Sequence, residues 1–241
     1  MIKVTIFNEY KHEQNNEKAI AVYPDGIHNV LKGFLECDEI SVRCVTLFDK
    51  ELNIKEDIGL SDEVLSNTDV LIWWGHVAHT KVPDDVVERC HKHIMDGMGA
   101  IFLHSAHHSK LFKKLMGTTC NLKWRFPSKE RLWNINPAHP IMQNVPEYFD
   151  IGLEEMYGER FDIPTPDELL MIGAFDGYEV FRAACTFQRG YGKVFYFQPG
   201  HETNPTFYIP EVQTIIKNAV YWAKPLYRQS FGAPKYEKVE L

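Results

Sequence analysis

Three histidines stand directly after strongly apolar runs of the sequence. The apolar runs are residues 70–74, 100–103 and 194–197, and the histidines that follow them are His76, His104 and His201. Continuous apolar runs of this length are typical of strands buried on both faces of a parallel sheet. Ligands of open α/β sheets bind outside the carboxyl ends of the strands. The spacing therefore predicts that the three imidazoles converge on one site.

Two kinds of chemistry suit a histidine cluster with a carboxylate nearby. Neutral imidazoles bind divalent transition metals, and imidazoles also move protons near neutral pH. The spacing does not separate these alternatives, because no H-E-x-x-H signature accompanies the histidines. For a metal site, with Zn or Mn as the ion, the candidate ligands are His28, His76, His104 and His201. For proton transfer, His76 and His104 are the catalytic candidates.

Adjacent carboxylates at Glu154 and Glu155 are further candidates for acid–base catalysis. If they lie on a strand, their side chains point to opposite faces, so one reaches the site and the other is solvated. His139, in the same part of the chain, is also a catalytic candidate. The substrate-binding candidates are polar rim residues or flat aromatic surfaces, namely Glu9, His107, Trp133 and Tyr157.

Nucleophilic and nucleotide chemistry have weaker support in the sequence. Ser105 lies at a strand-to-helix turn, where an elbow nucleophile would sit, but both glycines of G-x-S-x-G are missing. A serine hydrolase that uses Ser105 and a histidine base therefore stays an alternative. Walker and G-x-G-x-x-G loops are absent, so we expect no nucleotide cofactor.

The alternation of strand-like and helix-like patterns indicates how these residues are positioned. Strands are expected at 2–7, 41–47, 70–74 and 100–103, with helices at 27–35 and after Pro83. This order predicts a flavodoxin-like doubly wound parallel sheet in a three-layer α/β/α sandwich. The first and third strands then flank the point where the strand order reverses. The helix that begins near Gly26 starts at the same rim and brings His28 there.

The second half of the chain departs from this rhythm. Six prolines interrupt aromatic and charged segments, so we expect a single domain over residues 1–241 with an irregular insertion near 118–176 across the binding edge of the sheet. A hairpin is predicted at 183–188 and 193–198, followed by a final helix. The tail after Pro225 is interpreted as an arm that packs on a neighbouring copy, which predicts a homo-oligomer.

Composition narrows the class of partner. The chain has 241 residues and a formal net charge of −7, which argues against a nucleic-acid surface and favours a small neutral or polar ligand. No run of eighteen apolar residues exists, and the N-terminus lacks the pattern of a signal peptide, so we expect a cytoplasmic protein without membrane partners. The five cysteines include no C-x-x-C pair, which is typical of reduced buried thiols.

Several motifs in order resemble the ThuA-like family of trehalose-utilisation proteins. The resemblance spans nearly the whole chain, at residues 23–28, 69–76, 102–105, 139–141, 154–157 and 192–201. It implies a fold like that of class I glutamine amidotransferases without their catalytic cysteine, in whose place this chain has Ser105. It therefore implies no active glutamine amidotransferase. It also implies a role in carbohydrate catabolism.

Two functions of different classes follow from these observations. The first is an enzyme that acts on a sugar or keto-sugar at the histidine rim, as an isomerase, a lyase or a hydrolase. The second is a sugar-binding or regulatory protein that kept an amidotransferase-like scaffold without catalysis. Turnover of a small carbohydrate would separate the two.

Overall fold

The computed structural model describes residues 1–233, and within them nine strands form one sheet in the order β2-β1-β3-β4-β9-β8-β7-β5-β6. The strands are β1 (Ile2–Asn8), β2 (Ile40–Thr46), β3 (Val70–Trp74), β4 (Gly99–Leu103), β5 (Lys123–Asn134), β6 (Tyr148–Gly158), β7 (Glu168–Phe175), β8 (Val180–Arg189) and β9 (Gly192–Phe197). The helices are α1 (His12–Asn15), α2 (Glu17–Val22), α3 (Ile27–Leu35), α4 (Asp62–Ser66), α5 (Asp84–Met95), α6 (Lys110–Met116) and α7 (Pro210–Ala223). Short 3-10 turns are η1 (His79–Lys81), η2 (His104–His108), η3 (Pro140–Met142) and η4 (Thr206–Tyr208).

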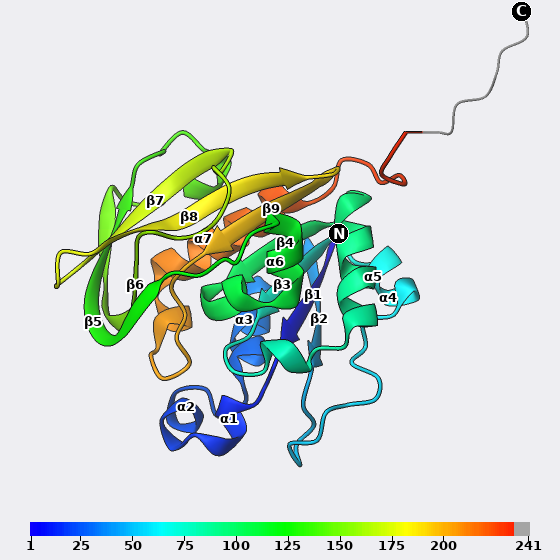
Figure 1. Cartoon of the computed structure of the whole chain (residues 1–241), viewed down its shortest axis with the longest axis horizontal. Coiled ribbons are helices and arrows are strands. Elements are labelled where there is room, and N and C mark those ends of the chain that lie inside the picture. The colour runs from blue at the N-terminus through cyan, green and yellow to red at the C-terminus, as the bar shows by residue number, and fades with distance from the viewer. Residues whose placement is uncertain (234–241) are drawn as a thin grey trace, which may run out of the picture.

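The first five strands of that order, β2, β1, β3, β4 and β9, run parallel. Every residue of β3 and β4 is buried, as expected for strands covered on both faces. Helices α3 and α7 pack on one face of the parallel strands, and α4, α5 and α6 pack together on the other (Figure 1). The predicted flavodoxin-like doubly wound sandwich is therefore confirmed.

The prolines of the segment at 118–176 predicted an irregular insertion, but the structure shows regular strands there. The segment forms β5, β6 and β7, which pair antiparallel and continue the sheet beyond β8 (Figure 1). Pro127 lies where the register of β5 against β6 shifts between Arg125 and Ser128. The other prolines of the segment lie between strands. Proline is tolerated at bulges and strand ends, so these residues shape the strands without abolishing them.

The remaining expectations about the second half concern the hairpin and the tail. Strands β8 and β9 form the predicted hairpin around the turn at 190–191. The tail packs on its own chain, because Tyr227 and Phe231 both lie against Tyr191. Residues 234–241, the rest of the expected arm, lie outside the described residues, and the homo-oligomer stays a prediction. In the described part of the chain, no helix is long and apolar enough to cross a membrane.

Candidate functional site

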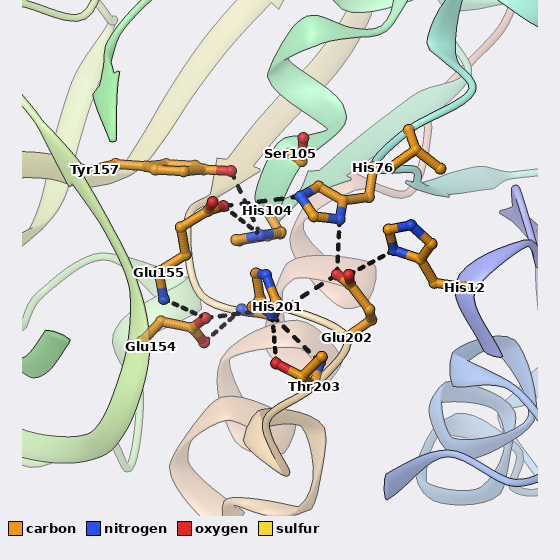
Figure 2. Close-up of polar contacts among 12 residues, drawn as sticks. His12, His76, His104, Ser105, Glu154, Glu155, Tyr157, His201, Glu202 and Thr203 are labelled. Atoms are coloured by element: carbon orange, nitrogen blue, oxygen red, sulfur yellow. Dashed lines mark hydrogen bonds and ion pairs between the residues drawn. The ribbon is translucent and has the colours of Figure 1, made fainter. Parts of the chain in front are cut away.

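The three strand-end histidines lie together in space (Figure 2). The centres of their rings are 5.6 Å apart for His76 and His104, 5.1 Å for His76 and His201, and 5.5 Å for His104 and His201. They extend from β3, β4 and β9, which are consecutive parallel neighbours. The carboxyl ends of these strands therefore form one triangle of imidazoles.

His104 occupies the strained turn at the end of β4. Its φ is 52°, a left-handed value that non-glycine residues rarely adopt, whereas Ser105 was expected at this elbow. The ring is fully buried, and Nδ1 donates a hydrogen bond to the carbonyl of Gln198 at 3.0 Å. That bond fixes the proton on Nδ1 and leaves Nε2 directed at Glu155.

Glu155 and His104 form a buried ion pair. Oε2 of Glu155 lies 3.2 Å from Nε2 of His104 and 3.9 Å from Nε2 of His76. Burial lowers the pKa of His104, but the adjacent carboxylate outweighs burial and the pKa is raised. Burial likewise raises the pKa of Glu155, and His104 reverses the effect, so that pKa is lowered. Both shifts favour an imidazolium facing a carboxylate.

Tyr157 lies on the same face of β6 as Glu155, two residues further along. Its ring stacks on the imidazole of His104, with ring centres 5.1 Å apart and planes 15° from parallel. Its hydroxyl is 3.4 Å from Nε2 of His104. Because alternate residues of a strand share a face, one strand supplies both groups to the site.

The alternation of side chains along a strand predicted that one of the two glutamates would be solvated. Glu154, the one that does not line the pocket, is instead buried. It is fully buried and accepts hydrogen bonds from the backbone N–H groups of Gly200 at 3.0 Å and His201 at 3.1 Å, and from the hydroxyl of Thr206 at 2.8 Å. It therefore anchors the loop that carries His201. Glu154 lies outside the pocket lining, so it positions the site instead of reaching the ligand.

Glu9 has the same role for the loop after β3. One carboxylate oxygen accepts the backbone N–H groups of His76, Val77 and Ala78, each at 2.9 Å. Burial raises the pKa of Glu9, although these hydrogen bonds oppose the rise. Glu9 was predicted to bind substrate, but the structure places it behind the loop as an anchor.

Glu202 and His12 complete the cluster, and neither was among the residues proposed from the sequence. Nδ1 of His12 lies 2.5 Å from Oε1 of Glu202, and Nδ1 of His76 lies 2.8 Å from Oε2 (Figure 2). Burial would raise the pKa of Glu202, but its contacts with His12 and His76 lower it. The sequence signal for Glu202 was its place beside His201, whereas His12 had only its position in a rim loop.

Two groups of side chains among the described residues offer metal-ligand atoms within 4.8 Å of one another. One group is His76, Glu155 and His201, and the other is His12, His76 and Glu202. His28 belongs to neither group. Its Nδ1 contacts the side-chain amide of Asn8 at 3.0 Å, and burial lowers its pKa to about 4. Of the four predicted ligands, His104 likewise belongs to neither group, so only His76 and His201 remain together as candidate ligands.

A pocket of about 390 Å³ opens above the cluster. Its lining is His76, Ser105, His107, His108, Leu122, Trp124, Phe126, Glu155, Tyr157 and His201. The ring of Phe126 stacks on that of His201, with centres 4.7 Å apart. Trp124 is 65% exposed and Phe126 44% exposed, so both present open aromatic surface at the rim. Phe126 was not identified from the sequence.

The other predicted residues separate into those at the pocket and those away from it. His107 lines the pocket, and its Nδ1 is bonded to the carbonyl of Cys120 at 2.8 Å. His139 lies elsewhere, where it caps η3 through the N–H of Ile141. Trp133 also lies outside the lining, with its ring 4.9 Å from that of Tyr148. Their sequence signals, a histidine before proline and an aromatic on a strand, reflect local structure.

The parallel strand order and the strand-end site define a class I glutamine amidotransferase-like fold. The PurLQS structure from Thermotoga maritima is similar, with a TM-score of 0.51 and 11% identity over 92% of this chain and 99% of that chain. The model of the ThuA family, described as trehalose utilisation, matches residues 3–223, and the chain belongs to this family.

Solved structures agree with that assignment at the level of the fold. A ThuA-like protein from Parabacteroides merdae has a TM-score of 0.67 and 16% identity over 95% of this chain and 92% of that chain. A cytoplasmic protein from Salmonella typhimurium has a TM-score of 0.60 and 12% identity over 92% of this chain and 100% of that chain. No curated protein sequence matches the chain.

The anchoring role of Glu154 predicts a loss of stability on substitution. Glu154→Gln keeps the size of the side chain but replaces one of its two acceptor oxygens by an amide nitrogen, which can only donate. At least one buried N–H or hydroxyl then lacks a partner, and the free energy of unfolding should fall by about 1–3 kcal/mol. Denaturant unfolding measures this change, with Glu51→Gln on the exposed surface as control. Amide hydrogen exchange should also accelerate in Glu154→Gln, and only at residues 200–206. Equal exchange rates there in Glu154→Gln and Glu51→Gln would contradict the anchoring role.

Proposed function

We propose that the protein is an enzyme of sugar metabolism that moves protons on a sugar or keto-sugar, as an isomerase, a lyase or a hydrolase. The observation that carries the proposal is the triangle of His76, His104 and His201 around the carboxylate of Glu155, beneath an aromatic-walled pocket. Membership of the trehalose-utilisation family supports a carbohydrate as the substrate.

The pocket suits a sugar ring in both shape and composition. Trp124 and Phe126 present flat apolar surface, and the C–H face of a pyranose packs against such surface. A sugar also needs hydrogen-bond partners for its hydroxyl groups, and His76, Glu155 and His201 in the same lining can supply them. A few polar groups that converge in a largely apolar pocket are typical of a small-molecule site.

Glu155 is the proton acceptor in this proposal. It lines the pocket, while His104 lies behind it and keeps its carboxylate ionised. With a keto-sugar, the carboxylate would take a proton from the carbon next to the carbonyl, leaving an enediolate. Return of the proton to a different atom or face gives isomerisation, and loss of a neighbouring hydroxyl gives elimination. His76 lies within reach of the same ligand to donate a proton to oxygen.

The lining also fits a divalent cation, by the chemistry of its donors. Two imidazoles and a carboxylate, from His76, His201 and Glu155, are ligand types that Zn and Mn accept. Their orientation is supported from behind, because the hydroxyl of Thr203 lies 2.9 Å from Nδ1 of His201 and Glu202 contacts Nδ1 of His76. When bound, the ion would polarise a carbonyl or hydroxyl oxygen of the sugar. A Glu155 oxygen that held the ion would not be free to accept a proton, so metal binding and proton transfer by Glu155 are alternative uses of the same site.

Proton transfer is tested by exchange in heavy water. Wild-type protein is incubated with trehalose, other disaccharides and monosaccharides, and their keto forms, and deuterium incorporation next to the carbonyl is followed by NMR together with product formation. Glu155→Gln should lower the rate by about 10²–10⁴-fold, because the amide cannot accept the proton. Glu147→Gln, an exposed residue before β6, should leave it unchanged. Binding without exchange or turnover would instead identify a sugar-binding protein and contradict the proposal.

Metal binding is tested by elemental analysis of protein purified without a metal-affinity tag. We expect about one Zn or Mn for each chain, and loss of that metal in the double variant His76→Ala, His201→Ala. His91→Ala, on α5 and away from the pocket, should retain it. Metal that stays in the double variant, or its absence from wild type grown with both metals, would exclude this ligand set.

The sugar platform is tested by comparing two tryptophans on β5. Trp124→Ala removes the open aromatic surface at the pocket and should raise KM, or Kd by calorimetry, about tenfold, the equivalent of roughly 1.4 kcal/mol, with little change in kcat. Trp133→Ala removes a ring from the same strand outside the pocket and should have no such effect. Equal effects, or an effect of Trp133→Ala alone, would place the sugar elsewhere.

A further inference from the structure

Ser105, His79 and Glu9 form a second chain of polar contacts at the wall of the pocket. The hydroxyl of Ser105 lies 3.4 Å from Nε2 of His79. On the other side of the same ring, Nδ1 of His79 lies 3.3 Å from Oε1 of Glu9. An acid at Nδ1 and a hydroxyl at Nε2 is the order of groups by which hydrolases activate a serine.

The other hydrogen bonds of Glu9 and His79 leave Oε1 of Glu9 and Nδ1 of His79 free to bond to each other. Oε2 of Glu9 is occupied by three backbone N–H groups, whereas Oε1 and Nδ1 of His79 are buried without a hydrogen-bond partner. The two atoms are already within hydrogen-bonding distance, so a small reorientation of the ring would satisfy both. The proton of His79 would then lie on Nδ1 and leave Nε2 free to accept from Ser105.

The surroundings of His79 keep its ring neutral. Burial is the main cause that lowers the pKa of His79 to about 3, and the adjacent His108, His76 and Lys113 add to the effect. The ring is therefore neutral and able to accept a proton, but so low a pKa makes it a weak base, and the contact of Nδ1 with Glu9 would have to stabilise the imidazolium as it forms. Ser105 itself lines the pocket, so a ligand can reach the hydroxyl while the ring and Glu9 lie behind it.

We propose that Ser105 is a nucleophile, with His79 as its base and Glu9 as the group that orients His79, and that the protein hydrolyses carboxylic esters of sugars. Neither the strand-end histidine triangle nor Glu155 takes part. The substrate class follows from the shared pocket, whose aromatic wall would hold the sugar part while the acyl group faces Ser105. The choice of a sugar as the alcohol part rests on the proposed function, whereas the nucleophile does not.

The reaction balances without a cofactor or an external oxidant. The oxygen of Ser105 bonds to the acyl carbon as its proton passes to Nε2 of His79. The bond from the acyl carbon to the alcohol oxygen then breaks, and His79 returns the proton to the leaving alcohol. Water, deprotonated by His79, attacks the acyl-serine, which releases the carboxylic acid and restores the hydroxyl of Ser105.

Covalent labelling tests the nucleophile on the full-length protein. A fluorophosphonate probe should label wild-type protein at Ser105, located by peptide mass spectrometry, and p-nitrophenyl acetate should be hydrolysed. Ser105→Ala should abolish labelling, whereas Ser66→Ala, at an exposed serine, should not change it. Folded wild-type protein that stays unlabelled at Ser105 overturns the proposal, whatever the outcome of the deuterium-exchange experiment.

The role of His79 is tested by a change that a merely structural role would not produce. In Ser105→Cys, alkylation by iodoacetamide should proceed at pH values well below about 8.5, the usual pKa of a free cysteine thiol, because His79 accepts the thiol proton. Adding His79→Gln should move the pH profile of alkylation back toward that value. An identical profile in the two variants would exclude His79 as the base, and circular dichroism establishes that both are folded.

Discussion

The geometry of the site depends on two buried carboxylates that bind backbone N–H groups. Glu9 holds the loop after β3, and Glu154 holds the loop after β9. Burying a carboxylate without hydrogen-bond partners costs several kcal/mol. Loop conformations that donate N–H groups to the carboxylate are therefore strongly preferred over those that do not. Loops at strand ends lack the repeating hydrogen bonds of helices and sheets. These two glutamates provide a substitute, and His76 and His201 are fixed in place because their own backbone N–H groups belong to the two sets of bonds.

The imidazoles that these loops present are electrostatically unequal, although they lie within one cluster. The pKa of His104 is raised because the effect of Glu155 exceeds that of burial, whereas the pKa of His201 is lowered by burial and by the positive charge of His104. One ring therefore favours its charged form and another its neutral form. Sites in which neighbouring groups have their pKa values driven apart hold an acid and a base at the same pH. The raised pKa of His104 arises from one carboxylate on β6, which lies closer to His104 than to His76, whereas burial is the main cause of the lowered pKa of His201.

How much of this arrangement could be predicted depends on the distance along the chain over which each interaction acts. The apolar runs before His76, His104 and His201 are local signals, and they led to the strand order and the convergence of the three rings. The first-turn position of His28 was also a local signal, but the direction of its side chain depends on packing against Asn8 and Tyr10. Glu9 bonds to residues 76–78, and Glu154 bonds to residues 200 and 201. In each case the two segments are far apart in the sequence, and the pattern of one does not predict its contact with the other. The strands at 118–176 were missed because the prolines there fall at a bulge and between strands, where they are compatible with a sheet.

The division of the sheet into a parallel and an antiparallel half has a chemical counterpart. The parallel strands end in the three histidines, whereas the antiparallel β5 and β6 add Trp124, Phe126, Glu155 and Tyr157. The elbow after β4 illustrates how the halves cooperate. At such a turn a nucleophile would project from the sheet, but here the turn carries His104, which is fully buried behind Glu155. Its ring lies outside the pocket lining, whereas Glu155, whose pKa it lowers, lies within that lining. The turn therefore contributes to the pocket in two ways, because His104 lies behind Glu155 of β6 while the next residue, Ser105, lies in the pocket lining.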